Sequence, residues 1–179
     1  AVLRRHWQSG AVASMVVCDV PREKVPSYVV VVADSAGTIT SFQEKPTMEE
    51  ARSRQVNTGI YVFEPQVIDL IPRGINYDIG SELFPLILER GLSFHAIDIP
   101  FNWIDIGQLS DYWEASQQLM RGKLQGVSMP GTEVLPRIWT GLNVDVDWDH
   151  VRIEGPAYIG PACPIEANSE IIGHTWICL

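Results

Sequence analysis

The sequence predicts an α/β layer fold followed by the start of a parallel β-helix. Short apolar runs rich in valine and isoleucine alternate with short helical segments as far as Met120, a pattern typical of α/β domains. Beyond that point isoleucines recur every six residues, at positions 153, 159, 165, 171 and 177. We therefore expect one domain over residues 1–125, and over residues 126–179 a linker followed by the repeat.

Turn residues bound the first elements of the α/β region. Gly10 closes a short basic helix, and the turn Asp34-Ser-Ala-Gly37 joins two β-branched runs into a hairpin. In order, the expected elements are a helix end at 3–8, a strand at 12–17, a charged loop at 21–26, and hairpin strands at 28–33 and 38–42.

Proline, serine and glycine bound the later elements in the same way. The expected elements are a strand at 60–63, a helix at 65–71 stopped by Pro72, a helix at 82–90 capped by Ser81, a strand at 93–99 whose apolar side carries His95, Ile97 and Ile99, a short strand at 101–107, and a helix at 111–121 capped by Ser110.

Small residues accompany the six-residue repeat in a second register. Each lies four places after an isoleucine, at Ala157, Cys163, Ser169 and Thr175. A repeat of this kind is typical of a parallel β-helix, in which the isoleucines fill the interior and the small residues fit tight corners. Val144 and Val151 fit a degenerate earlier coil.

Composition excludes several classes of partner. The formal charge of −9 argues against a nucleic acid or an anionic membrane as the main partner. No apolar run approaches the roughly 18 residues that a membrane span requires. The three cysteines form no CxxC or cysteine–histidine cluster, which favours reduced, buried cysteines in a cytoplasmic protein. The four histidines have no partner at a metal-ligand spacing.

The stretch from Phe42 to Phe63 carries the candidate binding residues. Pro46 cannot donate a ladder hydrogen bond, so the strand should end there and leave Lys45 at its tip. Ligands of open α/β sheets bind outside strand ends, where a lysine can hold a phosphate and Glu44 can accept from hydroxyl groups. The alternative is an ordinary surface Glu–Lys pair before a turn.

The other end of this stretch supplies Asn57, Thr58 and Gly59, which open an apolar strand. The side chain of Asn57 both donates and accepts, and Gly59 lets the backbone come close to a ligand. Strand alternation puts Glu44 and Lys45 on opposite faces, so both contact one ligand only if the strand twists or bulges before Pro46. The pattern indicates a site for an anionic, hydroxyl-rich small molecule.

Asp105 lies between two isoleucines just before a glycine, in the segment Trp-Ile-Asp-Ile-Gly. An unpaired carboxylate in apolar surroundings would be costly, so we expect Asp105 to have a partner. Either a structural hydrogen bond or a metal ion would satisfy it.

The ordered series FQEKP, VNTGIYVF, YDIGSELFP, WIDIG and DYW, followed by the six-residue repeat, resembles the sugar-1-phosphate nucleotidyltransferases, in particular mannose-1-phosphate guanylyltransferases and glucose-1-phosphate nucleotidyltransferases. Enzymes of this family condense a nucleoside triphosphate with a sugar 1-phosphate and release pyrophosphate. The resemblance implies a Rossmann-like domain followed by a left-handed β-helix. It also implies that Glu44 binds sugar hydroxyls, that Lys45 binds the sugar phosphate, and that Asn57, Thr58 and Gly59 line the sugar pocket.

The resemblance further implies that Asp105 helps to hold the catalytic Mg²⁺ of the complete enzyme, with Lys45 as the second catalytic residue. Nothing in the sequence resembles the family's glycine-rich triphosphate loop or its other metal-binding aspartate. We therefore expect residues 1–125 to be the sugar-phosphate-binding half of a catalytic domain, inactive by itself, with nucleoside triphosphate a partner only in a complete chain. The exposed edge of its parallel sheet would favour a homo-oligomer.

Two further hypotheses stay open. One is a non-catalytic sugar-phosphate-binding, regulatory or assembly module derived from this family. The other, which depends on the six-residue repeat alone, is a hexapeptide acyltransferase.

Overall fold

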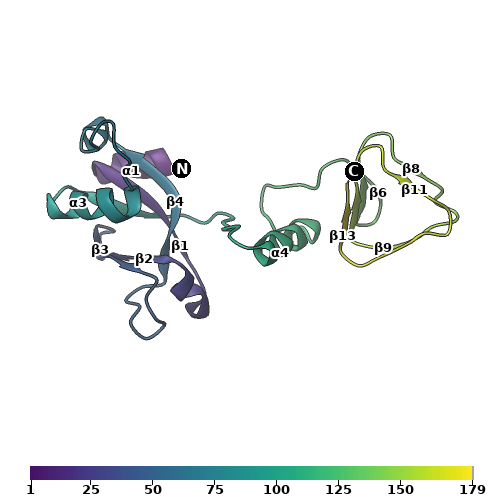
Figure 1. The fold of residues 1–179 in the computed structure, drawn as a ribbon, viewed down its shortest axis with the longest axis horizontal. Coiled ribbons are helices and arrows are strands. Elements are labelled where there is room, and N and C mark those ends of the chain that lie inside the picture. Colours follow the sequence, from purple (N-terminus) through teal and green to yellow (C-terminus); the bar gives the residue numbers. More distant parts are fainter. Residues whose placement is uncertain (179) are drawn as a thin grey trace. The chain divides into compact units, whose positions relative to one another are not determined.

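The computed structural model describes residues 1–178, which fold as two compact units. The first unit is Ala1–Trp103, and the second begins at Ile104 (Figure 1). The division falls earlier than the position between residues 125 and 126 that we expected, so that helix α4 (Leu109–Met120) belongs to the second unit. No helix of the described residues 1–178 is long and apolar enough to cross a membrane.

A five-stranded sheet forms the centre of the first unit, in the order β3-β2-β4-β1-β5. The strands are β1 (Ala13–Asp19), β2 (Val29–Ala33), β3 (Ile39–Glu44), β4 (Gln55–Phe63) and β5 (Phe94–Asp98). Only β1 and β5 pair in parallel, and the other neighbours are antiparallel. The α/β prediction is confirmed, whereas the expected parallel sheet is wrong because the sheet is mixed.

The hairpin of β2 and β3 forms around the predicted turn. Asp34 Oδ1 accepts from the backbone N–H groups of Ala36 and Thr38, both at 2.9 Å, as aspartate does in tight turns. The tip of the hairpin reaches β5, where Ala96 N donates to Gly37 O at 2.8 Å. Its base meets β4 through the pair Val30–Val56.

The short helices differ from the prediction in their ends. Helix α1 (Val2–Ser9) closes at left-handed Gly10, as predicted, and α2 (Pro65–Ile68) stops well before Pro72. Residues 21–26, predicted as a loop, lie largely in the 3₁₀ helix Arg22–Ser27. The predicted helix 82–90 is a π-helical turn, Ile79–Leu83, followed by α3 (Phe84–Glu89). Asp78 rather than Ser81 caps it, because the Asp78 carboxylate accepts from the Ser81 N–H.

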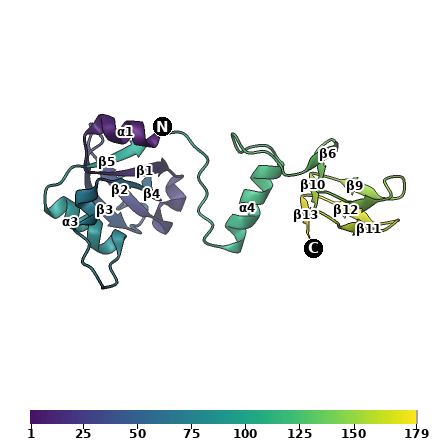
Figure 2. The same ribbon diagram turned by 90° about the horizontal axis from the view of Figure 1, so that it is seen from above.

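The main core of the first unit lies between the hairpin, β1 and α3. Phe42, Phe84 and Phe94 form a ring cluster with centroids 5.3–5.8 Å apart. The side of β5 opposite the one that we expected to be apolar is packed too, because Phe94 and Ala96 face this core. Ile97, on the other side, is buried as well. Figure 2 shows α1 beside β5 and α3 beside β3.

The burial of the histidines and cysteines also differs from what the sequence indicated. His6, to which we assigned no role, is buried, with Nδ1 2.8 Å from Ser14 Oγ and Nε2 3.1 Å from Glu64 Oε1, and so ties α1 to β1. Of the three cysteines only Cys163 is buried, whereas Cys178 is exposed.

The second unit contains helix α4 (Leu109–Met120) and a set of short strands. Gln108 rather than Ser110 caps α4, through reciprocal hydrogen bonds with Asp111. The strands are β6 (Thr132–Leu135), β7 (Ile138–Thr140), β8 (Asp145–Val146), β9 (Arg152–Glu154), β10 (Ala157–Ile159), β11 (Pro164–Ile165), β12 (Glu170–Ile172) and β13 (Thr175–Ile177).

Parallel pairing relates these strands at nearly constant offsets. Ile138 pairs with Ala157, which in turn pairs with Thr175. The same pattern relates β8 to β11 and β9 to β12. The five periodic isoleucines share one interior cluster with Ala157 and Cys163, and Val144 joins it. Parallel pairing already begins at Ile138 of β7, before the six-residue repeat starts at Ile153. The isoleucine pattern did not reveal these earlier strands, because β7 and β8 do not carry isoleucine at every sixth position.

Candidate functional site

The backbone turns sharply at the tip of β3. The strand ends at Glu44, before Pro46, as predicted. Lys45 takes a left-handed conformation, with φ at 41°, which interrupts the alternation of side chains along the strand. Lys45 Nζ consequently lies 4.0 Å from Glu44 Oε1, and the two side chains are 63% and 70% exposed. The twist that we required for both residues to contact one ligand is therefore present.

This conformation of Lys45 has an energetic cost. A left-handed non-glycine residue is disfavoured by roughly 1–2 kcal/mol, and it persists only where its surroundings hold it. Two neighbours hold Lys45. Its N–H donates to Tyr28 O at 3.1 Å, and the Pro46 that follows is buried. Strained residues of this kind cluster at ligand-binding sites.

Asn57, Thr58 and Gly59 form a bulge inside β4 rather than the opening of a strand. Met15 of β1 pairs with Tyr61, and Val17 pairs with Asn57, so a step of two residues on β1 faces a step of four on β4. The Thr58 hydroxyl donates to Val16 O at 2.7 Å and replaces a ladder hydrogen bond there. Gly59 has φ at 81°, which a glycine adopts without strain.

The polar side chains of the bulge are bonded to the protein itself. Asn57 Oδ1 accepts from Gly59 N, and Asn57 Nδ2 donates to Tyr61 Oη, both at 2.9 Å. Asn57 and Thr58 therefore hold the shape of the strand. Gly59 remains open, because a Cβ placed there would meet no atom within 4 Å.

An aromatic pair that the sequence analysis did not identify joins the strand tip to the bulge. The rings of Tyr28 and Trp103 lie 5.4 Å apart, and Trp103 Nε1 donates to Thr58 O at 3.1 Å. Tyr28 O in turn accepts from Lys45 N. The only sequence signal was the position of Trp103 in WIDIG, because Tyr28 and Trp103 are brought together by folding alone.

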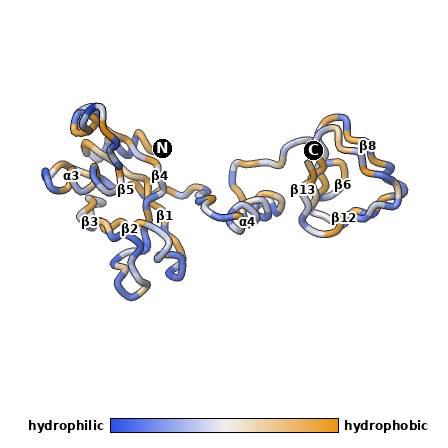
Figure 3. The backbone as a smooth tube through the Cα atoms, viewed as in Figure 1, coloured by the Kyte–Doolittle hydropathy of each residue, from blue (hydrophilic) through white to orange (hydrophobic). Residues whose placement is uncertain are grey.

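A polar loop, residues 47–54, connects the tip with the bulge. Thr47 and Glu50 cap its first turn, since Thr47 N and Oγ1 both donate to Glu50 Oε2. These hydrogen bonds lower the pKa of the Glu50 carboxyl group. Gln43 of β3 fixes the next part, because it donates to Glu50 O and accepts from Arg52 N. Figure 3 shows this loop among the hydrophilic parts of the first unit.

Asp105 belongs to the second unit and does not have the buried surroundings that we expected. Residues 101–107 form no strand, Asp105 is exposed, and its neighbour Ile106 is 58% exposed. Within residues 1–178 no group of three or more histidine, cysteine, aspartate or glutamate side chains is placed to hold a metal ion. Magnesium often takes only one or two carboxylates and completes its shell with substrate phosphates and water. A single exposed carboxylate fits that donor set only together with such phosphates.

The fold and the tip together define a class of protein, an α/β domain that presents a cation and a carboxylate side by side at the end of a strand. The chain belongs to the nucleotidyl transferase family, whose model matches residues 1–122. The resemblance seen in the sequence is thereby confirmed.

Individual relatives carry the names of sugar-1-phosphate nucleotidyltransferases. A UTP–glucose-1-phosphate uridylyltransferase of Synechocystis sp. is 47% identical over 175 residues, which are 98% of this chain and 45% of that protein. A glucose-1-phosphate adenylyltransferase of Jannaschia sp. is 32% identical over 64% of this chain and 32% of that protein. The mannose-1-phosphate guanylyltransferase catalytic subunit beta of Drosophila melanogaster is 32% identical over 88% and 38%. The chain spans less than half the length of these relatives.

Proposed function

We propose that this chain provides the sugar-1-phosphate-binding part of an enzyme that condenses a nucleoside triphosphate with a hexose 1-phosphate, giving a nucleotide-sugar and pyrophosphate. The observation that carries the proposal is the left-handed Lys45, which places a cation and the Glu44 carboxylate 4.0 Å apart at a strand tip. The name of the relative that is 47% identical favours glucose 1-phosphate and UTP as the first substrates to test.

The residues of the first unit divide the work of binding. The Lys45 ammonium group binds the sugar phosphate as a point charge, and the Glu44 carboxylate accepts from sugar hydroxyl groups. Gly59 offers open backbone on which the sugar ring can lie. Asn57 and Thr58 shape the pocket by holding the bulge that carries Gly59.

The proposed reaction requires positioning and charge compensation more than a covalent nucleophile. An oxygen of the sugar phosphate attacks the α-phosphorus of the nucleoside triphosphate, and the bond from that phosphorus to the departing pyrophosphate breaks. Lys45 compensates charge on the attacking phosphate. Bound Mg²⁺ would supply neutralisation of the triphosphate, and we propose the exposed carboxylate of Asp105 as one of its ligands.

For the second unit we propose the start of a left-handed β-helix built from hexapeptide repeats. The parallel pairing of β7, β10 and β13 and the shared interior of the isoleucines support a coiled arrangement. The handedness comes from the family resemblance. For the first unit we propose self-association into a homo-oligomer through an edge of its sheet, which β3 and β5 bound.

Isothermal titration calorimetry of residues 1–179 with glucose 1-phosphate tests the binding proposal. Glucose 6-phosphate is the matched control, because it carries the same charge but places the phosphate on another carbon. We expect binding of glucose 1-phosphate and weaker binding of the control. A titration with mannose 1-phosphate compares the affinities for the two sugars. Absence of heat with both 1-phosphates would remove the proposal.

A pyrophosphate-release assay separates an enzyme from a non-catalytic module. Residues 1–179 carry no glycine-rich triphosphate loop, so with UTP, glucose 1-phosphate and Mg²⁺ we expect binding without turnover. Release is expected when the missing family segment is supplied. Intact sugar-phosphate binding without release in that complete protein would favour the module instead.

A further inference from the structure

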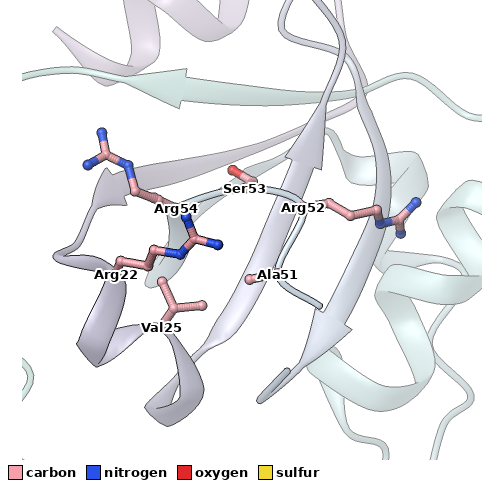
Figure 4. A pocket seen from close by; sticks show the side chains of 6 residues that line it. All are labelled: Arg22, Val25, Ala51, Arg52, Ser53 and Arg54. Carbon is pink, nitrogen blue, oxygen red and sulfur yellow. The ribbon is translucent and has the colours of Figure 1, made fainter. Parts of the chain in front are cut away.

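A pocket of about 310 Å³ lies on the first unit, beside the loop 47–54. Its lining is cationic and consists of Arg22, Val25, Ala51, Arg52, Ser53 and Arg54. Figure 4 shows Arg22 and Arg54 on the same side of the loop, whereas the Arg52 side chain points away from them. Arg22 and Arg54 thus place two cations beside one pocket of a chain whose net charge is −9. Such a concentration of one sign attracts counter-ions of the opposite sign.

The two guanidinium groups beside the pocket retain donors for a ligand. A guanidinium has five N–H donors. Arg22 Nη2 donates to Met48 O at 3.2 Å, and Arg54 Nη2 donates to Asp19 Oδ2 at 3.1 Å. Arg54 and Asp19 are both exposed, so water screens their ion pair. With Asp19 counted, the two arginines still leave one positive charge beside the pocket.

The remaining lining residues hold the pocket in shape. Val25 and Ala51 belong to the apolar cluster that also contains Tyr28 and Trp103, so the apolar part of the pocket lining and the aromatic pair of the candidate site share one core. Ser53 Oγ accepts from Gln55 N at 3.0 Å, which fixes the chain where the loop enters β4. Lys45 and Gly59 do not contribute to this lining. The pocket is therefore separate from the proposed sugar-phosphate residues, although the same loop connects to both.

We propose that this pocket is a second anion site, which takes the phosphate group of a small molecule such as inorganic phosphate or pyrophosphate. The planar fork of arginine matches two phosphate oxygens at once, and two such forks on one pocket suit a multiply charged ligand. The apolar lining gives no hydrogen-bonding partner for a sugar, so the ligand is held through its phosphate. This site does not depend on transferase activity.

Calorimetric titration of residues 1–179 with orthophosphate and, separately, with pyrophosphate tests the site at constant ionic strength. We expect Arg22→Ala and Arg54→Ala each to weaken the binding by about tenfold, the loss typical of one charge-assisted hydrogen-bonded contact. Arg52→Ala is the matched control, because it removes the same charge from the loop that carries Arg54. The Arg52 side chain points away from Arg22 and Arg54 and donates to Ser41. The binding by this control variant should stay within about threefold of the wild type.

Two further variants separate this site from the strand tip. Arg22→Lys keeps the charge and loses the fork, so its affinity should fall between those of the wild type and Arg22→Ala. In Lys45→Ala, orthophosphate should still shift the Ala51 and Ser53 amide signals, because Lys45 does not line this pocket. Retained glucose 1-phosphate binding in Arg22→Ala would show that the variant is folded. If Arg22→Ala also loses glucose 1-phosphate binding, the site is tested in the wild type instead. Orthophosphate should then shift the amide signals of Ala51 and Ser53 in the wild-type protein.

Four results would overturn the proposal. The first is a wild-type protein that binds neither anion up to about 20 mM. The second is an equal loss in Arg52→Ala and Arg22→Ala, which would indicate a general charge effect. The third is loss of the Ala51 and Ser53 shifts in Lys45→Ala, which would place the anion at the strand tip. The fourth is an absence of shifts at Ala51 and Ser53. Glucose 1-phosphate binding is measured in a separate titration of each variant, so the failure of this site and the failure of the proposed function are distinguishable.

Discussion

The strand tip and the bulge of β4 both carry predicted binding residues, yet they use their side chains differently. At the tip, Glu44 and Lys45 are mostly exposed and lie 4.0 Å from each other. At the bulge, the Asn57 amide and the Thr58 hydroxyl are bonded to neighbouring strand residues. We infer that the tip contacts the ligand and that the bulge fixes the surface beside it. Residue type within a motif does not by itself distinguish these roles.

The largest expected effect is on stability, at the bulge. Thr58→Val keeps the shape of the side chain but leaves the buried Val16 carbonyl without the donor that now lies 2.7 Å away. We expect the free energy of unfolding of the first unit to fall by about 1–3 kcal/mol, the cost of an unsatisfied buried acceptor. Amide hydrogen exchange of β1 and β4 measures this loss.

The control for Thr58→Val is Thr40→Val. The Thr40 hydroxyl also donates to a strand carbonyl, Val32 O at 3.1 Å, but Thr40 is exposed and water can replace it. The control should change stability by less than about 0.5 kcal/mol. Similar losses in the two variants would contradict a special role for the bulge.

The next effect is on binding, at the tip. Lys45→Ala removes the cation from the proposed sugar phosphate, so we expect the affinity for glucose 1-phosphate to fall by about tenfold. The stability of the first unit should change little, because the ammonium group is exposed. Calorimetry measures the affinity, and Arg73→Ala provides a charge-matched control elsewhere on the same unit. If both variants bind alike, the tip is not the ligand-binding region.

A third variant separates the Lys45 side chain from its backbone. Lys45→Gly and Lys45→Ala both lack the cation, but only glycine adopts a φ of 41° without strain. We expect the glycine variant to be more stable than the alanine variant by roughly 1 kcal/mol, with equally weak binding. Thermal unfolding of the two variants gives the comparison. An alanine variant that is as stable as the glycine variant would mean that the tip stores no strain.

Local signals in the sequence were enough to predict the tip. Pro46 ends β3 because it lacks an N–H, and Gly10 closes α1 because it tolerates a left-handed conformation. The hairpin turn follows from the ability of the Asp34 side chain to accept backbone N–H groups. Each of these features depends on residues within a few positions of one another.

Features that depend on a distant partner could not be predicted. The bulge at Thr58 exists because Val16, 42 residues away, offers its carbonyl. Tyr28 and Trp103 meet only through the fold. Asp105 was expected to be buried because isoleucines flank it, but residues 101–107 do not join the sheet and the carboxylate remains exposed. Burial is set by what covers a segment, and the flanking residues do not contain that information.

The smallest expected effect concerns the loop that joins the tip to the bulge, and it depends on pH. The hydrogen bonds from the Thr47 hydroxyl and N–H favour the ionised form of Glu50 and lower its pKa below the usual 4.5. A lowered folded-state pKa contributes stability that is fully present above the unfolded value, about 4.5, and is lost as the pH falls through the folded value. The contribution is small because Glu50 is exposed to solvent.

We therefore expect the Thr47 amide proton signal to move with a midpoint below pH 4.5 as the cap opens, in a titration followed by nuclear magnetic resonance. Glu50→Gln should abolish this transition, because the side chain no longer titrates. Asp78 supplies the internal control. Its pKa is lowered by hydrogen bonds from Ser81, so the Ser81 amide signal should show its own acid transition, unchanged in Glu50→Gln. A Thr47 transition that persists in that variant would assign it to another group and leave the loop independent of acid.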